Sequence, residues 1–198
     1  MNPFKILSAL LGPVLLLATG APALAQMQLS CAVPYTQVLQ HEPLLVVVSI
    51  RNDSAQPVAA GGAEGFSLSF DVTDPDGIRI HPRGEATTWV PGSVPALAEV
   101  MFTNDLQMLF RLDKPGAVAI SARLQVAGRT YTTTRSLVEI QPGSEVARRQ
   151  TPAADGSLRT VTLRTMNRAQ RDRIFLRLDD EAAGLCYGVF ELGRYIRV

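Results

Sequence analysis

The chain has 198 residues, of which 46% are hydrophobic, with 19 basic and 18 acidic side chains and a formal net charge of +1. This balance argues against a nucleic-acid binder or a general binder of anionic membranes, because such proteins carry a clear excess of positive charge. The length suits one β-sandwich domain with a smaller unit, or one large domain.

The first 25 residues have the features of a signal peptide. Lys5 is followed by an apolar stretch from Ile6 to Thr19, and Ala23-Leu24-Ala25 fits the small-x-small cleavage pattern. The apolar stretch is shorter than the roughly 20 residues that span a membrane. We therefore predict cleavage after Ala25 and a periplasmic or secreted protein with no transmembrane segment, a retained membrane anchor being the alternative.

Short strands separated by turns are expected from residue 26 to residue 141. The Val-rich run from Leu44 to Ile50 is typical of a strand buried on both faces or in the core of a sandwich. Residues 66–73 alternate apolar with polar side chains, as in a strand with one wet face. Asp74-Pro75-Asp76-Gly77 has the composition of a tight turn. Further short strands are expected at 29–33, 78–80 and 98–102, and residues 106–112 show some alternation.

The clearest long-range pattern is a hairpin. Residues 117–127 alternate, Gly128-Arg129 favours a turn, and residues 130–140 are rich in threonine and other strand-forming residues. Before the hairpin, residues 83–97 are rich in proline and glycine and are predicted to form a loop. This loop holds Trp89, which is a candidate contact residue or, alternatively, a cover for one end of the core.

The composition changes after Gln141. Residues 142–157 have few large apolar side chains and are predicted to be a linker. Residues 158–198 are predicted to form a small unit of three or four strands, in which Gly188 and Gly193 mark a bulge or bend. About 40 residues bury too little surface to fold alone, so this unit should pack on the first domain. Single helical turns at 143–150 or 167–173 are alternatives.

Fragments within residues 42–141 resemble a bacterial immunoglobulin-like or fibronectin-III-like module. Glu42–Asn52 is similar to a strand of such modules that begins with Glu-Pro, continues as an apolar run and ends with Asn. Leu112–Ala122 is similar to a late strand of these modules that contains Pro-Gly. Residues 130–140 would be the closing strand, whereas Val118 stands where many relatives have a corner tyrosine. The resemblance implies an all-β fold, an immunoglobulin-like antiparallel β-sandwich over residues 26–141 followed by a small β extension, and it implies no particular function.

Two cysteines, Cys31 and Cys186, lie near opposite ends of the mature chain. An even number of cysteines in an exported protein favours a disulfide bond between them. Two free thiols are an alternative. A third reading, lipidation of Cys31, fits less well because Gln28 stands where lipoprotein signals have an aliphatic residue.

No pattern of reactive residues is visible. His41 and His81 each lie beside a proline turn and are predicted to be exposed loop residues outside any catalytic frame. The cysteines and histidines are too scattered for a zinc site. Asp71, Asp74 and Asp76 are interpreted as a turn, with an edge-loop calcium site as the alternative. We therefore predict no catalytic residue, no cofactor and no metal ligand.

Arginine is concentrated towards the C-terminus, where eight arginines lie between residues 148 and 177. Arginine forms bidentate contacts with carboxylate, phosphate or sulfate groups. An acidic surface glycan or an acidic protein face is thus a candidate partner, unless these side chains form a solvated face paired with acidic residues elsewhere in the chain. The candidate anion-binding residues are Arg164, Arg168, Arg171 and Arg173.

These patterns together predict an exported, non-enzymatic binding or structural accessory protein whose partner is unknown. A free sheet edge could recruit a partner chain by strand addition. One alternative is an inhibitor of extracytoplasmic proteases that presents residues 83–97, since Phe66–Val72 and Asp76-Gly77 resemble parts of the small β-sandwich proteinase inhibitors of bacilli. The second alternative is a hydrolase whose reactive residues converge only in three dimensions.

Overall fold

The computed structural model describes residues 26–62, 65–84, 88–154 and 156–196. Over these ranges the chain consists of β-strands and one single-turn helix, α1 (Leu106–Leu109), so the predicted all-β class is confirmed. The same ranges contain no helix that is long and apolar enough to cross a membrane. The predicted signal peptide, residues 1–25, lies outside the described residues.

One sheet is organised around the Val-rich run. The side chains of Val46, Val48 and Ile50 in its central strand are fully buried, because β-branched residues pack well on a pleated surface that faces a core. The expected first strand and the strand expected at 98–102 flank the central strand on its two sides. In spatial order, the antiparallel strands are β1 (Met27–Ala32), β3 (Leu45–Asn52) and β8 (Glu99–Asp105).

A second sheet lies opposite the first. Its first strand runs parallel to its neighbour and the other pairs are antiparallel. The predicted turn at 74–77 is present, because the Asp74 carboxylate accepts backbone N–H groups of Asp76 and Ile78 at 2.9 and 2.8 Å. In spatial order, the strands are β2 (Gln37–Leu39), β11 (Ser136–Gln141), β9 (Gly116–Val126), β5 (Phe66–Thr73) and β6 (Arg79–Ile80), with β10 (Arg129–Thr132) also beside β9.

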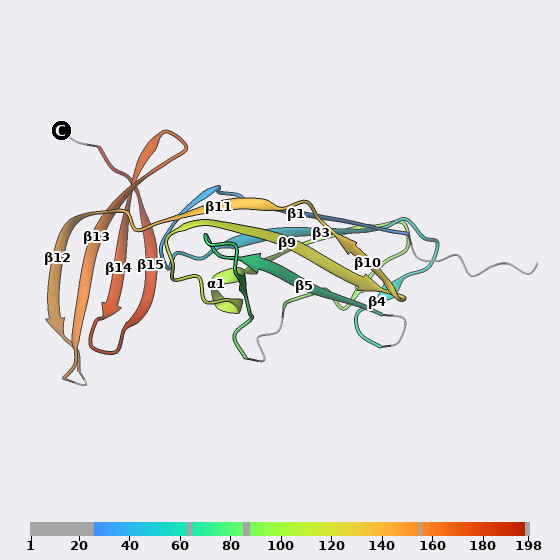
Figure 1. Ribbon diagram of the computed structural model, residues 1–198, viewed down its shortest axis with the longest axis horizontal. Helices are drawn as coiled ribbons and strands as arrows, with labels where there is room; N and C mark the ends of the chain where they lie inside the picture. Colours follow the sequence, from blue (N-terminus) through green and yellow to red (C-terminus); the bar gives the residue numbers. More distant parts are fainter. Residues whose placement is uncertain (1–25, 63–64, 85–87, 155, 197–198) are drawn as a thin grey trace, which may run out of the picture.

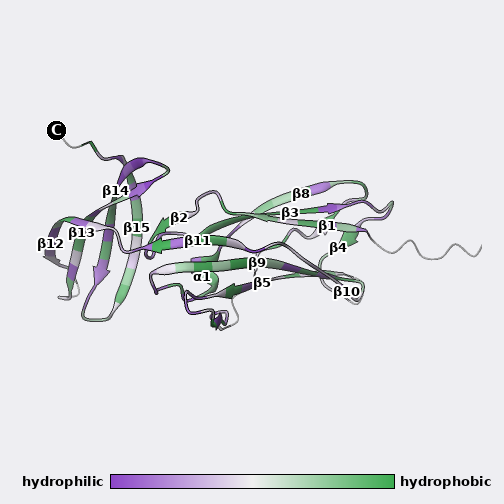
Figure 2. Cartoon of the chain, turned by 45° about the horizontal axis from the view of Figure 1, so that its top comes forward, coloured by the Kyte–Doolittle hydropathy of each residue, from purple (hydrophilic) through white to green (hydrophobic). Residues whose placement is uncertain are grey.

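The two sheets pack face to face and share one hydrophobic core (Figures 1 and 2). The alternation in β5 is explained by this packing, since its apolar residues are buried in the core and Ser67 and Ser69 are exposed. Residues 106–109 form α1 instead of continuing the alternation, with Asp105 accepting the Gln107 N–H as the N-cap. A short strand pair, β4 (Val58–Ala59) and β7 (Ser93–Val94), completes this unit.

The predicted hairpin is present with one irregularity. β10 and β11 both pair with β9, but residues 133–135 between them are not part of a strand. There the Thr133 N–H donates to the Ala122 carbonyl, and the Thr133 hydroxyl accepts the Ala122 N–H at 3.0 Å. The side-chain hydroxyl thus replaces a backbone carbonyl where the strand is interrupted.

A separate four-stranded antiparallel sheet forms the C-terminal unit. Its first strand lies where the sequence predicts a linker, so that prediction is wrong. Much of the segment 142–157 is a strand, whose residues are all exposed. Neither face of this strand packs against the rest of the described chain, so its sequence shows no apolar periodicity. The strands are β12 (Ser144–Pro152), β13 (Leu158–Arg168), β14 (Arg171–Asp180) and β15 (Leu185–Arg194).

The connections in this sheet are tight. Residues 167–173 form a hairpin rather than a helical turn, with Ala169 and Gln170 at φ values of 50° and 63°, the left-handed geometry of a two-residue hairpin turn. Gly188 and Gly193 lie at two register shifts between β14 and β15, so the predicted irregularities are present. Bulges of this kind twist an edge strand.

The C-terminal sheet packs against one end of the sandwich (Figure 1). A small buried cluster joins Leu39 of β2 to Met166, Phe175 and Val189 of the C-terminal sheet. Gly143 allows the close approach, because a Cβ there would lie 2.5 Å from a Leu39 methyl group, and its φ is +68°. The connection between the two units is therefore a short contact at 142–143, not a long linker.

Candidate functional site: a groove between the two units

Arg168, a candidate anion-binding residue, is buried at the junction and is only 4% exposed. Its guanidinium pairs with Glu42 of the sandwich and, at 3.0 Å, with Glu191 of β15. It also lies over the rings of Tyr35 and Phe175, at 4.6 and 5.2 Å from their centres, an arrangement that favours a cation. Arg168 thus holds the two units together and does not face solvent.

The other candidate anion-binding arginines divide between paired and exposed positions. Arg164 pairs with Glu145 at 3.3 Å and donates to the Pro142 carbonyl at 2.8 Å, and Arg173 pairs with Glu191 at 3.0 Å. Arg171 is exposed on the β13–β14 turn. The structure therefore does not bring the four into one site, and three of them contact acidic residues of the chain itself.

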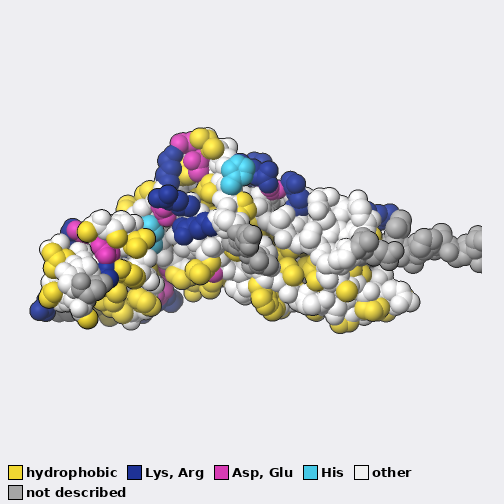
Figure 3. All heavy atoms as spheres, turned by 90° about the horizontal axis from the view of Figure 1, so that it is seen from below, with side chains coloured by type: hydrophobic (Ala, Val, Ile, Leu, Met, Phe, Trp, Pro, Cys, Tyr) yellow, Lys and Arg dark blue, Asp and Glu magenta, His cyan; other side chains and the backbone are white. Residues whose placement is uncertain are grey.

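A groove of about 810 Å³ runs between β15 and the end of the sandwich. Residues 183–190 form one wall, and the opposite wall comes from α1 and the nearby loops. The β15 wall is largely apolar, with Tyr187, Val189 and Phe190, and Met108 faces it from α1. Figure 3 shows basic side chains gathered near this junction, with apolar side chains on both sides.

A cluster of basic groups around Asp113 lines the sandwich side of the groove. Asp113 pairs with Arg111 at 2.6 Å, with Arg83 at 3.9 Å and with the His41 Nδ1 at 3.6 Å. Arg83 and Arg111 are 50% and 80% exposed. One carboxylate is thus shared by two exposed, permanently charged arginines and a histidine, and Asp105 adds a second carboxylate to the lining.

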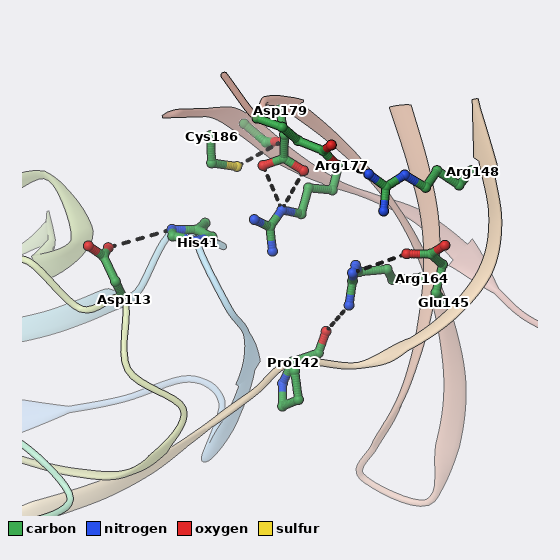
Figure 4. Close-up of polar contacts among 11 residues, drawn as sticks. His41, Asp113, Pro142, Glu145, Arg148, Arg164, Arg177, Asp179 and Cys186 are labelled. Carbon is green, nitrogen blue, oxygen red and sulfur yellow. Dashed lines mark hydrogen bonds and ion pairs between the residues drawn. The ribbon is translucent and has the colours of Figure 1, made fainter. Parts of the chain in front are cut away.

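A smaller adjoining cavity of about 280 Å³ is lined by ion pairs of the C-terminal sheet. Arg177 pairs with Asp179 at 2.8 Å, and Arg148 pairs with Glu181. Figure 4 shows His41 between Asp113 on one side and Arg177 on the other. The lining of the smaller cavity is therefore polar, and its arginines are paired with acidic residues of the same sheet, unlike the apolar wall of the larger groove.

His41 is half-buried, not the exposed loop residue that the sequence predicts, whereas His81 is exposed. Burial lowers the pKa of His41 below 6.5, and the charge of Arg177 lowers that pKa further, while Asp113 and Asp179 oppose the change. The imidazole is thus neutral in the folded protein at pH 7. It lines the groove together with residues 183–190 of the C-terminal unit, a proximity that the local sequence does not reveal.

We expect the free energy of unfolding to fall as the pH drops below about 6.5. Between the lowered folded pKa of His41 and its ordinary value, the unfolded chain binds a proton that the folded chain does not bind. Urea unfolding at pH 7.5 and 5.5 measures this change. His41→Gln should reduce the change and His81→Gln, at the exposed histidine, should leave it intact; equal changes in both variants would contradict the assignment.

Cys31 and Cys186 are free thiols in the structure, so the expected disulfide is not formed. Cys31 pairs with Val48 in the first sheet, whereas Cys186 pairs with Asp179 in the C-terminal sheet, and no strand pairing joins these sheets. Burial raises the pKa of Cys31 to about 11, and burial followed by the charge of Asp179 raises that of Cys186. Both side chains are therefore protonated thiols.

We expect a reducing agent to leave the melting temperature of the purified protein unchanged. Cys186→Ser should likewise melt close to the wild type under oxidising conditions, because no covalent loop is lost. Thermal unfolding with and without dithiothreitol measures this. An intact mass two hydrogens below that of the dithiol, with a lower melting point on reduction, would show that a bond forms.

The groove does not contain an activated nucleophile among the described residues. Cys186 and His41 line the same space, but the thiol contacts the Gly188 carbonyl at 3.7 Å. A catalytic cysteine needs a lowered pKa, whereas the pKa of Cys186 is raised. Cys186 therefore lacks the activation that a thiolate nucleophile requires.

Trp89 lies in the predicted loop, part of which, residues 85–87, is outside the described residues. Its side chain is 59% exposed and its ring meets Phe102 edge-on at 5.4 Å. The Asn104 side chain accepts the Trp89 N–H at 2.9 Å and donates to its carbonyl at 3.1 Å. Trp89 is therefore an exposed aromatic residue on an anchored backbone.

The three aspartates considered for calcium have other partners. Asp71 pairs with Arg79 and Arg123 at 2.6 and 2.7 Å, and Asp74 accepts the backbone of the turn. Asp76 pairs with Lys114. The turn interpretation therefore agrees with the contacts of this segment.

Fold and site together define an all-β protein of two packed units with a partly apolar, partly cationic groove between them. No protein-family model matches the chain, and no curated protein matches it. Among solved structures, the chain is similar to Spo0M, a sporulation control protein from Bacillus subtilis, at 12% identity and a TM-score of 0.35, over 84% of this chain and 90% of that chain. A likeness of this strength carries no argument about function.

Proposed function

We propose that the protein is an exported, non-enzymatic binding or structural accessory protein that acts in the periplasm or outside the cell. Its N-terminal sequence supports export, since it combines a basic start, an apolar stretch and a small-residue cleavage pattern. The near-equal numbers of acidic and basic residues support a protein or glycan partner over nucleic acid.

The larger unit is proposed to be an immunoglobulin-like sandwich. Its strand orders β1-β3-β8 and β11-β9-β5-β6 correspond to A-B-E and G-F-C-C′ in immunoglobulin domains. Such sandwiches host many unrelated functions, so this fold supports a binding module without naming its ligand.

The observation that carries the binding proposal is the groove beside β15. Tyr187 and Phe190 are 50% and 56% exposed there, next to the arginines around Asp113. Exposed apolar side chains with a charged rim are typical of an interaction site.

Photo-crosslinking in the native host tests this function. A photoreactive residue at Tyr187 should give a discrete product with an exported protein, whereas one at Leu158, equally exposed but outside the groove, should not. No product from Tyr187, or the same products from both positions, would contradict binding at the groove.

A second candidate function is inhibition of extracytoplasmic proteases. It is favoured by Trp89, which is exposed on a backbone held at both polar groups by Asn104, because a rigid exposed loop loses little entropy on binding. A panel of secreted proteases tests it. Inhibition at micromolar protein that Trp89→Ala abolishes would support it, and no inhibition would remove it.

A further inference from the structure

The outer edge of β15 is unpaired within the described part of the chain. β15 is the last strand in the order β12-β13-β14-β15, and its backbone hydrogen bonds are made to β14. Consecutive residues from Ala183 to Phe190 line the groove. Because successive side chains of a strand point to opposite faces, a run of this kind means that the strand edge itself borders the groove.

The regular part of this edge is short. Between the two register shifts, Gly188 to Glu191 pair with β14 without interruption. Bulges normally protect an edge against pairing, so only this stretch is suited to accept another strand. Gly188 has no side chain, and the ring of Phe190 lies over it, 3.0 Å from the position that a Cβ would occupy.

The wall opposite this edge carries two exposed arginines, Arg83 and Arg111, beside the carboxylates of Asp105 and Asp113. Asp113 is shared by Arg83, Arg111 and His41. Asp105 also lines the groove, but its Oδ1 accepts the backbone N–H groups of Leu44 and Gln107, both at 3.0 Å. The exposed ends of Arg83 and Arg111 are therefore the charges available to a partner.

We propose that the groove binds an extended, acidic segment of a partner protein as an added strand beside β15. Resting on the proposed binding function, this inference specifies the chemistry of its partner. Backbone groups of the segment pair with residues 188–191, its apolar side chains contact Tyr187 and Phe190, and a carboxylate pairs with Arg83 and Arg111. Strand addition of this kind takes affinity from the backbone and specificity from alternate side chains.

The free edge at the other side of the C-terminal sheet does not supply such a segment from a second copy. β12 carries Arg148 and Arg149 and ends at Pro152, and its one acidic residue, Glu145, is paired with Arg164 at 3.3 Å. It therefore offers no unpaired carboxylate for Arg83 and Arg111. A different protein with an acidic strand is the occupant that the charges favour.

A peptide library tests the proposal on the full mature protein. The probes are ten-residue peptides with varied apolar residues at alternate positions, threonine between them, and two aspartates at one end. A matched library ends in two lysines. Fluorescence anisotropy should show binding of selected aspartate peptides at least about tenfold tighter than that of their lysine counterparts, and hydrogen exchange should show protection at residues 188–191.

Charge reversal supplies the matched control. The double variant Arg83→Glu, Arg111→Glu should lose about tenfold or more in affinity for aspartate peptides and should gain affinity for lysine peptides. The control variant Arg129→Glu with Arg171→Glu, at exposed sites outside the groove, should leave the affinity for both kinds of peptide unchanged. N-methylation of the peptide backbone on alternate residues should abolish binding, because it removes the ladder donors.

Several results would overturn the proposal: no binding by either library, equal binding of both, or unchanged binding after N-methylation. Self-association of the protein that protects residues 188–191 would overturn it by assigning the edge to a second copy. Crosslinking at Tyr187 without peptide binding would leave the proposed binding function standing and refute strand addition. No crosslink at Tyr187 together with no peptide binding would refute both the proposed binding function and strand addition.

Discussion

Replacing Arg168 by alanine is expected to lower the free energy of unfolding by about 3 to 5 kcal/mol, as is typical when one partner of a buried ion pair is removed. Arg168 is 4% exposed and pairs with Glu42 and Glu191. Without it, the largely buried Glu42 keeps the hydrogen bond from the Leu39 N–H, at 2.8 Å, but loses its ion-pair partner. The rings of Tyr35 and Phe175 would also lose the cation that covers them.

Urea unfolding measures the loss, and two further variants identify its cause. Arg171→Ala, on the same hairpin but exposed, should change the free energy of unfolding by less than about 0.5 kcal/mol. Arg168→Met with Glu42→Gln should recover much of the loss, because the charge of Glu42 is removed and Glu191 stays paired with Arg173. An Arg168→Ala protein as stable as the wild type would show that the junction is held by the apolar cluster alone.

Replacing Asn52 by alanine is expected to cost about 3 kcal/mol, because each buried polar group left without a partner costs about 1 to 3 kcal/mol. Asn52 is fully buried at the end of β3. Its amide donates to the carbonyls of Gln56 and Pro95 at 2.7 and 3.1 Å, and its oxygen accepts the N–H and hydroxyl of Ser54. One side chain therefore fixes two neighbouring loops.

Thermal and urea unfolding test this role of Asn52. Asn52→Asp keeps an acceptor for Ser54 but places a carboxylate against the two carbonyls, so it should be at least as destabilising as alanine. Asn167→Ala, an exposed asparagine on the β13–β14 hairpin, is the matched control and should be close to neutral. Comparable losses for Asn52→Ala and Asn167→Ala would contradict a special role for the buried network.

Several strands could be predicted because their local pattern matches the environment in which they fold. The run at 44–50 is marked by Val46, Val48 and Ile50, which β3 buries in the core, and residues 66–73 alternate because only one face of β5 meets the core. The turn at 74–77 forms from its own side chains. Asn52, which ends the apolar run in the fragment Glu42–Asn52, proves to be a buried network residue rather than only the start of a polar loop.

β12 could not be predicted for a physical reason. Its side chains are all exposed, so no apolar periodicity marks it, and its stability comes from backbone bonds to β13. Chain composition alone does not distinguish such an edge strand from a linker. The same holds for residues 167–173, where two non-glycine residues adopt positive φ in a hairpin turn.

The groove depends on segments that are distant in sequence. His41, Asp113 and Cys186 come from the β2–β3 loop, the segment after α1 and β15. Sequence spacing carries no information about such proximity. It also could not separate Arg168 from the other arginines, since its partner Glu42 lies 126 residues away.

By itself the sequence determined the β class, the longer strands of the sandwich and the position of the tight turn, because side-chain periodicity and turn chemistry act over a few residues. Only the tertiary structure decided which arginines are buried, that the two thiols stay unpaired, and that an unpaired edge faces a groove lined by two exposed arginines. Burial and ion pairing depend on which surfaces meet, and here those surfaces belong to two units far apart along the chain.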